Sequence, residues 1–454
     1  MNGLLYTIPA FVIAIAILVV VHEFGHYWVA RRLGVKVLRF SVGFGRPLWM
    51  RRFGSDRTEW VIAAIPLGGY VKMLDENEGR VAARDRKRAF NRQPLWKRSL
   101  IVLAGPAFNL LFAVIAYTAV NLVGTEGLRP LVGTVATGSL AEQGGFRAGD
   151  EMLRVDEHPV QSWDERRLYL YEKALDRGKV RIAVRDADGL LQERTLDFSS
   201  VPASKVGAGL LEREIGLRPS LPALAPVIGS IEENSVASRA GFEVGDRILS
   251  INGLATALWS EAVEAISARP GELLMVRIDR GGIEKELDVR PEIRNIDGKS
   301  IGRIGVGVRI PEMPSSMRRV VRYEPWGAVQ EAVETTWRMS ALTLKLLGKL
   351  IQLEVSSKTI SGPITIAQYA GVAAKIGITP FIQFLAVVSI SLGILNLLPV
   401  PVLDGGHLLL YIIEGVRKKP LSDRVLHVAQ QAGLTMLVML MLLAFYNDFM
   451  RILH

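Results

Sequence analysis

Long apolar runs lie toward the two ends of the chain, and the stretch between them reads like a water-soluble protein. A membrane-spanning helix needs about 20 predominantly apolar residues, and four runs are candidates for such helices. The third run is too long, and too interrupted by proline and glycine, to form one plain helix. The pattern therefore predicts a polytopic α-helical membrane protein with four transmembrane segments, the third of them broken. The runs cover about Leu4–Val21 with a continuation into the His22 region, Leu100–Val123, Phe381–Ile413 and Ala432–Phe445.

Basic residues beside these runs predict the orientation of the chain, because Lys and Arg concentrate in cytoplasmic loops. Between Arg31 and Arg98 the sequence holds 17 Lys/Arg and 6 Asp/Glu, so this loop is expected in the cytoplasm. The short Arg417-Lys418-Lys419 link is expected there too. Four alternating spans then place both termini and the long middle segment outside. The first run could also be a signal peptide, but it lacks a basic start and a small-residue cleavage site.

The basic balance of the chain fits a membrane protein. The net charge is +10 and the pI is near 9.7, values that nucleic-acid-binding proteins share. Here the basic residues crowd beside apolar runs, which favours a lipid bilayer as partner and no nucleic acid. The chain has no cysteine, which excludes disulfides, thiolate ligands and a thiol nucleophile. A metal site must use carboxylates and the six histidines His22, His26, His158, His407, His427 and His454.

The water-soluble middle contains an internal repeat. The segment Val132–Trp163 recurs as Ile228–Trp259, at an offset of 96 residues and without gaps. Matches in register at this density indicate two copies of one domain of roughly 90 residues. In the second copy we expect strands at Arg247–Ile251 and Leu274–Ile278, with a helix at Ser260–Ala268 between them. The matching pairs are Gly133/Gly229, Ser139/Ser235, Ala141/Ala237, Gly145/Gly241, Phe146/Phe242, Gly149/Gly245, Asp150/Asp246, Leu153/Leu249 and Trp163/Trp259.

Each copy carries the pattern Ser-x-Ala-x-x-x-Gly-Phe-x-x-Gly-Asp-x-x-Leu, which resembles the PDZ domains of bacterial periplasmic proteases. The expected insert is thus a pair of α+β PDZ domains. Such domains bind extended peptides by adding a strand to a sheet edge. The candidate loop for a peptide terminus in the second copy is Gly302-Arg303-Ile304-Gly305. The alternative is a pair of spacer domains with closed grooves.

The end of the first apolar run carries the HExxH motif His22-Glu23-Phe24-Gly25-His26. On a helix, positions i and i+4 lie within about 40° of each other, so both imidazoles can face one metal ion. Glu23 lies on the adjoining face, where it can activate a water molecule as a general base. Ionisable residues at membrane depth are costly and therefore point to function. The alternative is that the three side chains cap the helix at the water interface.

A zinc site needs a third protein ligand, and the broken third run offers Asp404. Two prolines and two glycines interrupt the run within Asn396–His407. Irregular backbone at membrane depth is tolerated only where protein or a watery cavity covers it. A carboxylate there is expensive without a partner such as zinc. His407 competes for the role, but we favour Asp404 as the ligand and expect His407 to hydrogen-bond behind the ligands or to pack. One Zn²⁺ per chain is expected.

Two further segments carry local signals. Glu59–Pro66 and Tyr70–Leu74 flank Gly68-Gly69, as the strands of a hairpin would. A free edge there could pair with an unwound peptide, the alternative being a structural turn. Trp326–Leu353 is amphipathic with helical period, and it could lie at the outer membrane interface or pack on the domains as a linker helix.

Together these features resemble the site-2 protease family of intramembrane metalloproteases. The resemblance covers nearly the whole chain and shows no departure at the catalytic positions. Within that family it is nearest to the bacterial regulator-of-sigma-E protease type, which has four spans and two tandem PDZ domains. The matching stretches are Val21–Trp28, Gly43-Phe44-Gly45, Pro66–Met73, Ala104-Gly105-Pro106 with Asn109, Ser361–Ile364 and Asn396–His407.

The resemblance implies roles for the matching residues. His22, His26 and Asp404 would be the zinc ligands, and Glu23 would be the catalytic base. A further group would hold the substrate, partly from the broken helix and partly from a membrane-associated β-hairpin region that dips in from the cytoplasmic side. These residues are Asn396, Pro399 and Pro401 in the broken helix and Gly68, Gly69 and Tyr70 in the hairpin region.

The resemblance also implies an activity and its setting. The chain would hydrolyse single-span proteins within the bacterial inner membrane, near its cytoplasmic side: an anti-sigma factor already trimmed outside, and remnant signal peptides. Periplasmic PDZ domains would exclude substrates with large external domains, and the chain would be a monomer. One rival function is a PDZ-bearing scaffold or receptor with a degenerate zinc site. Another is a transporter, since broken helices with buried carboxylates also form ion paths.

The expected organisation follows from these boundaries. Residues 1–33 form the first span with HExxH, 34–98 the cytoplasmic-side loop with the β region, 99–123 the second span, 124–220 and 221–312 the two PDZ domains, 313–378 the amphipathic helix and linker, 379–416 the broken third span, and 417–454 the fourth span and C-terminus.

Overall fold

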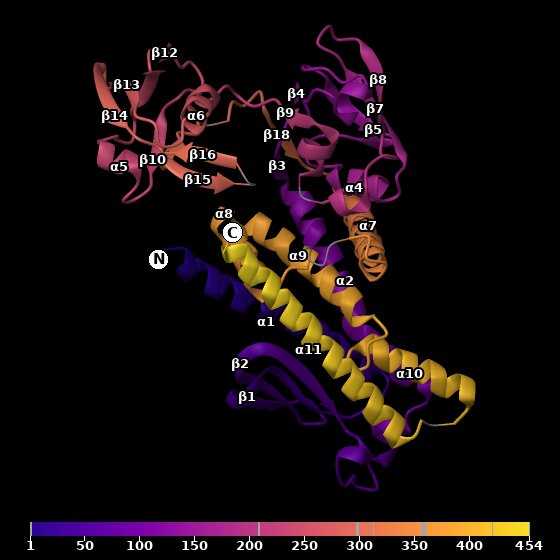
Figure 1. The fold of residues 1–454 in the computed structure, drawn as a ribbon. Helices are drawn as coiled ribbons and strands as arrows, with labels where there is room; N and C mark the ends of the chain where they lie inside the picture. The colour runs from indigo at the N-terminus through magenta and orange to yellow at the C-terminus, as the bar shows by residue number, and fades with distance from the viewer. Residues whose placement is uncertain are drawn as a thin grey trace.

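The structure is a computed structural model, and it describes residues 2–207, 209–296, 299–311, 313–355, 360–419 and 421–453. A layer of long helices stands beside two sheet-rich units, and both chain ends lie at the end of the helical layer that faces those units (Figure 1). Within the described ranges, four helices are long and apolar enough to cross a membrane, which confirms the predicted number of spans. They belong to α1 (Asn2–Arg32), α2 (Leu95–Val123), α9 (Ile378–Asn396) and α11 (Asp423–Leu453).

The third apolar run is broken, as the sequence predicts. Helix α9 ends at Asn396, and α10 (Asp404–Arg417) begins after an irregular segment. Val402 in that segment has φ 112°, a conformation that a β-branched residue adopts only where its surroundings impose it. Gly405 and Gly406 allow the start of α10 to fold back onto the segment, since a Cβ on either would stand 2.2 Å from a backbone carbonyl oxygen. The break is therefore a tightly packed structure.

Small residues bring the helices close together. Ala10 and Ala14 of α1 pack against Ala370 and Ala373 of α8 (Pro363–Ile376). Small side chains at helix contacts are the usual means of close packing between membrane helices. The region 313–378 was expected to hold one amphipathic helix and a linker, so α8 is an addition to that expectation. Its sequence signal is the Gly-Pro pair at positions 362 and 363, because proline is favoured at the first position of a helix.

The loop between α1 and α2 forms two long, bent strands, β1 (Val37–Phe53) and β2 (Thr58–Met73). The turn between them lies at residues 54–57, and Gly68-Gly69 lies inside β2. The expectation of a hairpin with Glu59–Pro66 and Tyr70–Leu74 as its two strands was therefore wrong. Both segments belong to β2 except for Leu74, which follows its last residue. Phe40 of β1 is registered with Trp60 as well as Val71, so β1 lies between the two ends of β2.

The two repeat units have the same topology. Each contains a four-stranded antiparallel sheet, β6-β5-β7-β8 in the first unit and β12-β11-β13-β14 in the second, and a separate strand pair, β4-β9 or β10-β17. The strand and the helix predicted in the second copy at Arg247–Ile251 and Ser260–Ala268 are confirmed as β11 and, shifted by one residue, α6. The element bounds are β4 (Val132–Val135), β5 (Glu151–Val155), β6 (His158–Pro159), α4 (Arg167–Leu175), β7 (Lys179–Arg185), β8 (Leu191–Asp197), β9 (Leu217–Pro219), β10 (Ile228–Ile231), β11 (Arg247–Ile251), β12 (Leu254–Ala255), α6 (Trp259–Ser267), β13 (Leu274–Arg280), β14 (Ile283–Val289), β15 (Glu292–Ile296), β16 (Lys299–Arg303) and β17 (Val306–Val308).

The Gly-Asp pair of the repeat has the same structural role in both units. Asp246 is fully buried and receives hydrogen bonds from Arg280 and from the backbone amide of Glu243. Asp150 is likewise buried and receives a hydrogen bond from Arg194. A buried carboxylate is stable only when it is paired, so each repeat keeps an aspartate and an arginine partner.

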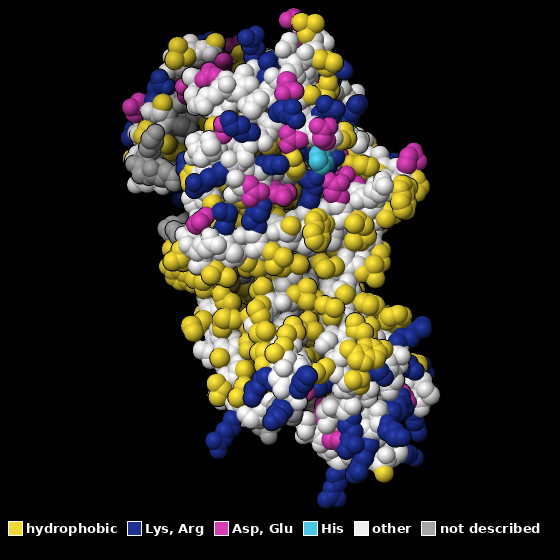
Figure 2. All heavy atoms as spheres, turned by 90° about the vertical axis from the view of Figure 1, so that its right-hand side faces the viewer, with side chains coloured by type: hydrophobic (Ala, Val, Ile, Leu, Met, Phe, Trp, Pro, Cys, Tyr) yellow, Lys and Arg dark blue, Asp and Glu magenta, His cyan; other side chains and the backbone are white. Residues whose placement is uncertain are grey.

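The inserted units are tied to the helices at two points. Strands β3 (Thr125–Leu128) and β18 (Arg318–Val321) pair, so the chain leaves α2 and returns to α7 (Pro325–Ile351) at one place. Helix α7 packs on α2 through small residues and binds the first unit through ion pairs, including Arg166–Glu331 at 3.1 Å. Below the units, hydrophobic side chains form a broad belt, with Lys and Arg gathered beneath it and charges of both signs above (Figure 2).

Candidate metal centre

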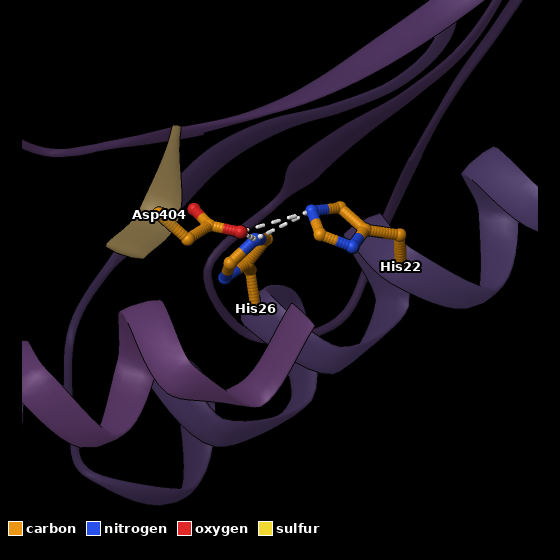
Figure 3. A group of neighbouring side chains, drawn as sticks. All are labelled: His22, His26 and Asp404. Atoms are coloured by element: carbon orange, nitrogen blue, oxygen red, sulfur yellow. Dashed lines mark hydrogen bonds and ion pairs between the residues drawn. The ribbon is translucent and has the colours of Figure 1, made fainter. Parts of the chain in front are cut away.

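Three side chains that could hold a metal ion converge between α1 and the start of α10 (Figure 3). His22 and His26 lie one turn apart on α1, and Asp404 is the first residue of α10. The Nε2 atoms of the two imidazoles are 3.2 Å apart. Oδ2 of Asp404 lies 3.2 Å from Nε2 of His22 and 3.5 Å from Nε2 of His26. Residues about 380 positions apart in the sequence thus direct one ligand atom each toward a common point.

The spacing of these atoms fits a tetrahedral zinc ion. Zn–N and Zn–O bonds of about 2.0–2.1 Å at tetrahedral angles put neighbouring ligand atoms about 3.3 Å apart. Oδ2 of Asp404 is buried and has no hydrogen-bond partner within the described part of the chain, so a cation would satisfy it. Two imidazoles and one carboxylate leave a fourth position for water or substrate. The ligand set therefore fits a catalytic zinc ion.

Helix α2 lies close enough to α1 to contact both imidazoles. A Cβ on Gly105 would stand 2.3 Å from Nε2 of His26 and 2.7 Å from Cε1 of His22, so only glycine fits there. Nδ1 of His26 donates to the carbonyl of Ile101 at 2.8 Å, which leaves the Nε2 lone pair free for a metal. On the other ring, the carboxamide of Asn109 lies 3.1 Å from Nδ1 of His22. Sequence reasoning gave none of these α2 residues a role.

Strand β2 lies against Glu23, the candidate base. The Glu23 carboxylate lies near the backbone amide of Val71. A Cβ on Gly69 would stand 3.2 Å from Cγ of Glu23 and 2.7 Å from a methyl group of Val19. Glycine at this position is thus a condition for the contact between the strand and the helix.

The candidate substrate residues lie on both sides of this centre. Asn396 is the last residue of α9, at the opposite end of the break from Asp404. Pro399 and Pro401 lie within the break, the first exposed and the second half-buried. Tyr70 follows the two glycines in β2, and its hydroxyl accepts a hydrogen bond from Arg39. Gly68 sits where its Cβ would stand 2.4 Å from the ring of Phe44, so it too must lack a side chain.

His407 lies one turn after Asp404 on α10, half-buried. The three-residue cluster found among the described residues does not include it. Its ring borders a cavity of about 430 Å³ between α10 and α11, which is also lined by His427 and by Gln430 and Gln431. Sequence reasoning did not single out His427, Gln430 or Gln431 for this surface.

The candidate peptide loop of the second unit lies beside α6. Ile304 is buried and its carbonyl accepts a hydrogen bond from Ala237, while Gly302 approaches the end of α6 so closely that a Cβ would stand 2.4 Å from the carbonyl oxygen of Ile266. The loop and α6 border a groove of about 130 Å³. Gly302, Arg303, Ile304 and Gly305 all line it.

Comparison with known proteins identifies the family. The model of "Peptidase family M50" matches residues 10–440. The chain belongs to this peptidase family. It is 41% identical to "Regulator of sigma-E protease RseP" of Salmonella typhimurium over 459 residues and 40% identical to the protein of that name from Escherichia coli over 457 residues, with both chains covered fully in each case. It is 42% identical to a "Putative zinc metalloprotease" of Neisseria meningitidis, covering 99% of this chain and 100% of the relative.

Membership of the family confirms that the chain is a zinc metalloprotease, as its HExxH motif predicts, and confirms the resemblance seen in the sequence. Among solved structures, a PDZ domain of the SdrC-like protein from Listeria monocytogenes matches 18% of this chain and 84% of its own, with 19% identity and a TM-score of 0.16.

Proposed function

We propose that this metalloprotease of family M50 is a zinc-dependent intramembrane endopeptidase. His22, His26 and Asp404 would hold one Zn²⁺ per chain, and Glu23 would be the general base. The observation that carries the proposal is the meeting of three ligand atoms, 3.2–3.5 Å apart, where the start of α10 meets α1, a helix apolar enough to cross a membrane. Bound zinc supplies a Lewis acid that polarises a carbonyl group and acidifies water.

Glu23 takes the proton from the attacking water and delivers it to the leaving amine. Its carboxylate lies near the backbone amide of Val71, so the base is close to strand β2. That contact links the proton transfer to the place where a substrate strand would lie. A general base contributes by its position as well as by its affinity for protons.

The substrate would bind as an extended strand, because a helix hides its carbonyls in i to i−4 hydrogen bonds. The end of β2 that contains Gly69 and Tyr70 is registered only with β1 among the strands that the structure describes, so its other edge can accept a strand. Asn396 has an amide that can pair with an unwound backbone from the opposite side of the centre. The substrate site would be bordered on the strand side by Gly68 and on the side of the helix break by Pro399 and Pro401. His407 would lie behind the metal ligands on α10.

The setting that we propose is the bacterial inner membrane, with the centre near its cytoplasmic face. On one side of the apolar belt most of the charged side chains are Lys and Arg, which is the pattern of a cytoplasmic surface (Figure 2). The two repeat units lie on the opposite side and would be periplasmic PDZ domains at 124–220 and 221–312. The chain would act as a monomer in contact with lipid, and β1–β2 would enter the bilayer from the cytoplasmic face.

The substrates would be single-span membrane proteins: a pre-trimmed anti-sigma factor and remnant signal peptides. Relatives carry the name regulator of sigma-E protease, which supports the first of these. The paired domains would gate substrate size because they stand over the helical layer. The groove beside Gly302–Gly305 would bind a peptide end, and its small volume suits one apolar side chain.

The test uses purified protein in detergent and a tagged single-span peptide. Wild-type protein should cleave the peptide, a zinc chelator should stop cleavage, and added zinc should restore it. Glu23→Gln should hold zinc but cleave nothing. Unchanged cleavage by Glu23→Gln would refute the assignment of the base, and cleavage that survives complete removal of zinc would refute the proposed centre.

A further inference from the structure

We propose that Asn109 of α2 is a positioning residue for His22, whose imidazole it holds so that Nε2 faces the metal position. The inference rests on the proposed zinc site and adds a residue to it. The two histidines are held by different kinds of group. Nδ1 of His26 is held by the backbone carbonyl of Ile101, whereas Nδ1 of His22 is met by a side chain.

The placement of Asn109 fits a residue with a function. It is fully buried in an otherwise apolar helix, and a buried amide costs free energy unless it makes hydrogen bonds. Its Nδ2 lies 3.1 Å from Nδ1 of His22, while its Oδ1 is buried without a hydrogen-bond partner in the described part of the chain. The imidazole is the partner that the structure provides for this amide.

Helix α9 fixes the backbone of Asn109 from the other side. The hydroxyl of Ser389 donates to the carbonyl oxygen of Asn109 at 2.8 Å. Gly393, one turn further along α9, lets the helices approach until a Cβ on it would stand 3.4 Å from Cβ of Asn109. The amide thus lies at the junction of α1, α2 and α9, where its position is determined by all three helices.

A carboxamide can serve both tautomers of the imidazole. When the proton is on Nε2, Nδ1 accepts from the amide NH₂ of Asn109. A metal ligand must keep Nε2 unprotonated, so the proton moves to Nδ1 and needs an acceptor. A half-turn of the carboxamide presents Oδ1 as that acceptor. The same side chain therefore holds the ring in the metal-free and in the loaded protein.

Substitutions of Asn109 can distinguish hydrogen bonding to His22 from simple packing. Leucine has a similar size but neither donates nor accepts, whereas aspartate accepts from Nδ1–H and so supports the ligand tautomer alone. Ser389→Ala is the matched control, because it removes the hydrogen bond to the Asn109 backbone and leaves the amide in place. The measurements on the full chain are zinc per chain and the half-time of zinc loss to excess chelator.

Asn109→Leu should shorten the residence of zinc about 10- to 100-fold, the effect of removing the hydrogen-bond partner of a metal-bound histidine. Asn109→Asp should hold zinc at least as long as the wild-type protein, and Ser389→Ala should resemble the wild type. If the leucine variant does not fold, Asn109→Ser carries the same test, since serine is too short to reach Nδ1.

Two results would overturn the inference. In the first, Asn109→Leu, or Asn109→Ser in its place, retains zinc as long as the wild-type protein. In the second, Asn109→Asp loses zinc as fast as Asn109→Leu. Either result would assign Asn109 to packing. Neither result would contradict the proposed zinc site itself. If the wild-type chain took up no zinc, the proposed metal centre would fail and this inference with it.

Discussion

Gly69 and Glu23 lie so close together that a Cβ on the glycine would stand 3.2 Å from Cγ of the glutamate. The same Cβ would stand 2.7 Å from the carbonyl oxygen of Ser41. The strand that contains Gly69 is the proposed binding edge for substrate, and Glu23 is the proposed base. Catalysis and strand binding therefore depend on one close approach, which only a residue without a side chain allows.

Gly69→Ala should lower kcat strongly while the protein still binds zinc. The added methyl group must push β2 away from α1, and a displacement of about 1 Å at a catalytic site can cost on the order of 100-fold in rate. Peptide cleavage by zinc-saturated protein measures the effect. Gly348→Ala is the control, since a Cβ there meets no atom within 4 Å and alanine favours a helix by about 1 kcal/mol. If Gly69→Ala kept the wild-type kcat, catalysis by Glu23 would not depend on the close approach of strand β2.

Gly105→Ala should remove zinc. Its Cβ would stand 2.3 Å from Nε2 of His26, the atom proposed to bind the metal, so the ring or helix α2 must move. Zinc per chain should fall well below that of the wild-type protein, and the gain in unfolding temperature on zinc addition should shrink with it, since metal binding stabilises the folded form. A Gly105→Ala protein with a full complement of zinc would contradict the proposed ligand geometry.

The parts of this structure that depend on residues near in sequence could be predicted. The spacing of His22 and His26 fixes them on one face of a helix wherever that helix lies. The break around Asp404 follows from proline and glycine in an apolar run. The repeat units could be aligned by counting residues, since Asp150 and Asp246 occupy matching positions.

The parts that depend on how distant segments meet could not be predicted. The sequence around Gly68-Gly69 does not indicate that β1 pairs with both ends of β2. For that reason the two glycines were assigned to a turn. The role of α2 was missed because Gly105 and Asn109 acquire their partners only when α1 packs on them. A buried asparagine in an apolar helix was the signal, since polar residues at membrane depth are costly.

The second repeat unit should lose stability in acid through Asp246. Burial raises the pKa of this carboxyl, but hydrogen bonds from Arg280 and from the amide of Glu243 outweigh burial, and the pKa lies below its usual value. A lowered pKa in the folded state stabilises above the unfolded pKa of about 3.9, and the contribution is lost as pH falls through the folded value. Stability should therefore fall below about pH 4.

Asp246→Asn removes this pH dependence and should destabilise the unit by about 2 kcal/mol near pH 7, because Arg280 loses its charge-assisted hydrogen bonds to the buried carboxylate and keeps only the exposed Glu243 as an ion-pair partner. Urea unfolding can be followed through a thiol introduced at the buried Val276, since the natural chain has no cysteine. Equal acid sensitivity in the wild-type and Asp246→Asn proteins would assign the acid effect to another group.

Arg166 should determine how strongly the first repeat unit is bound to helix α7. Its side chain is 8% exposed and lies 3.1 Å from Glu331 of α7, next to Glu165, which accepts a hydrogen bond from Tyr323. Arg166→Gln leaves two half-buried glutamates without this cation, and loss of one partner of a largely buried ion pair costs up to about 3–5 kcal/mol. The unit should then move relative to α7, and if it excludes bulky substrates, a single-span peptide with a folded outer domain should become cleavable.

Lys345→Gln is the matched control for Arg166→Gln. Lys345 also joins α7 to the first unit, through Asp176 at 2.8 Å, but that pair is exposed and worth about 1 kcal/mol or less. The measurements are the cleavage of peptides with and without the folded domain, and the distance between spin labels on the first unit and on α2. Cleavage of the bulky peptide should rise for Arg166→Gln alone. If the labels separate in Arg166→Gln while the bulky peptide stays intact, the unit is anchored by this arginine but does not limit substrate size.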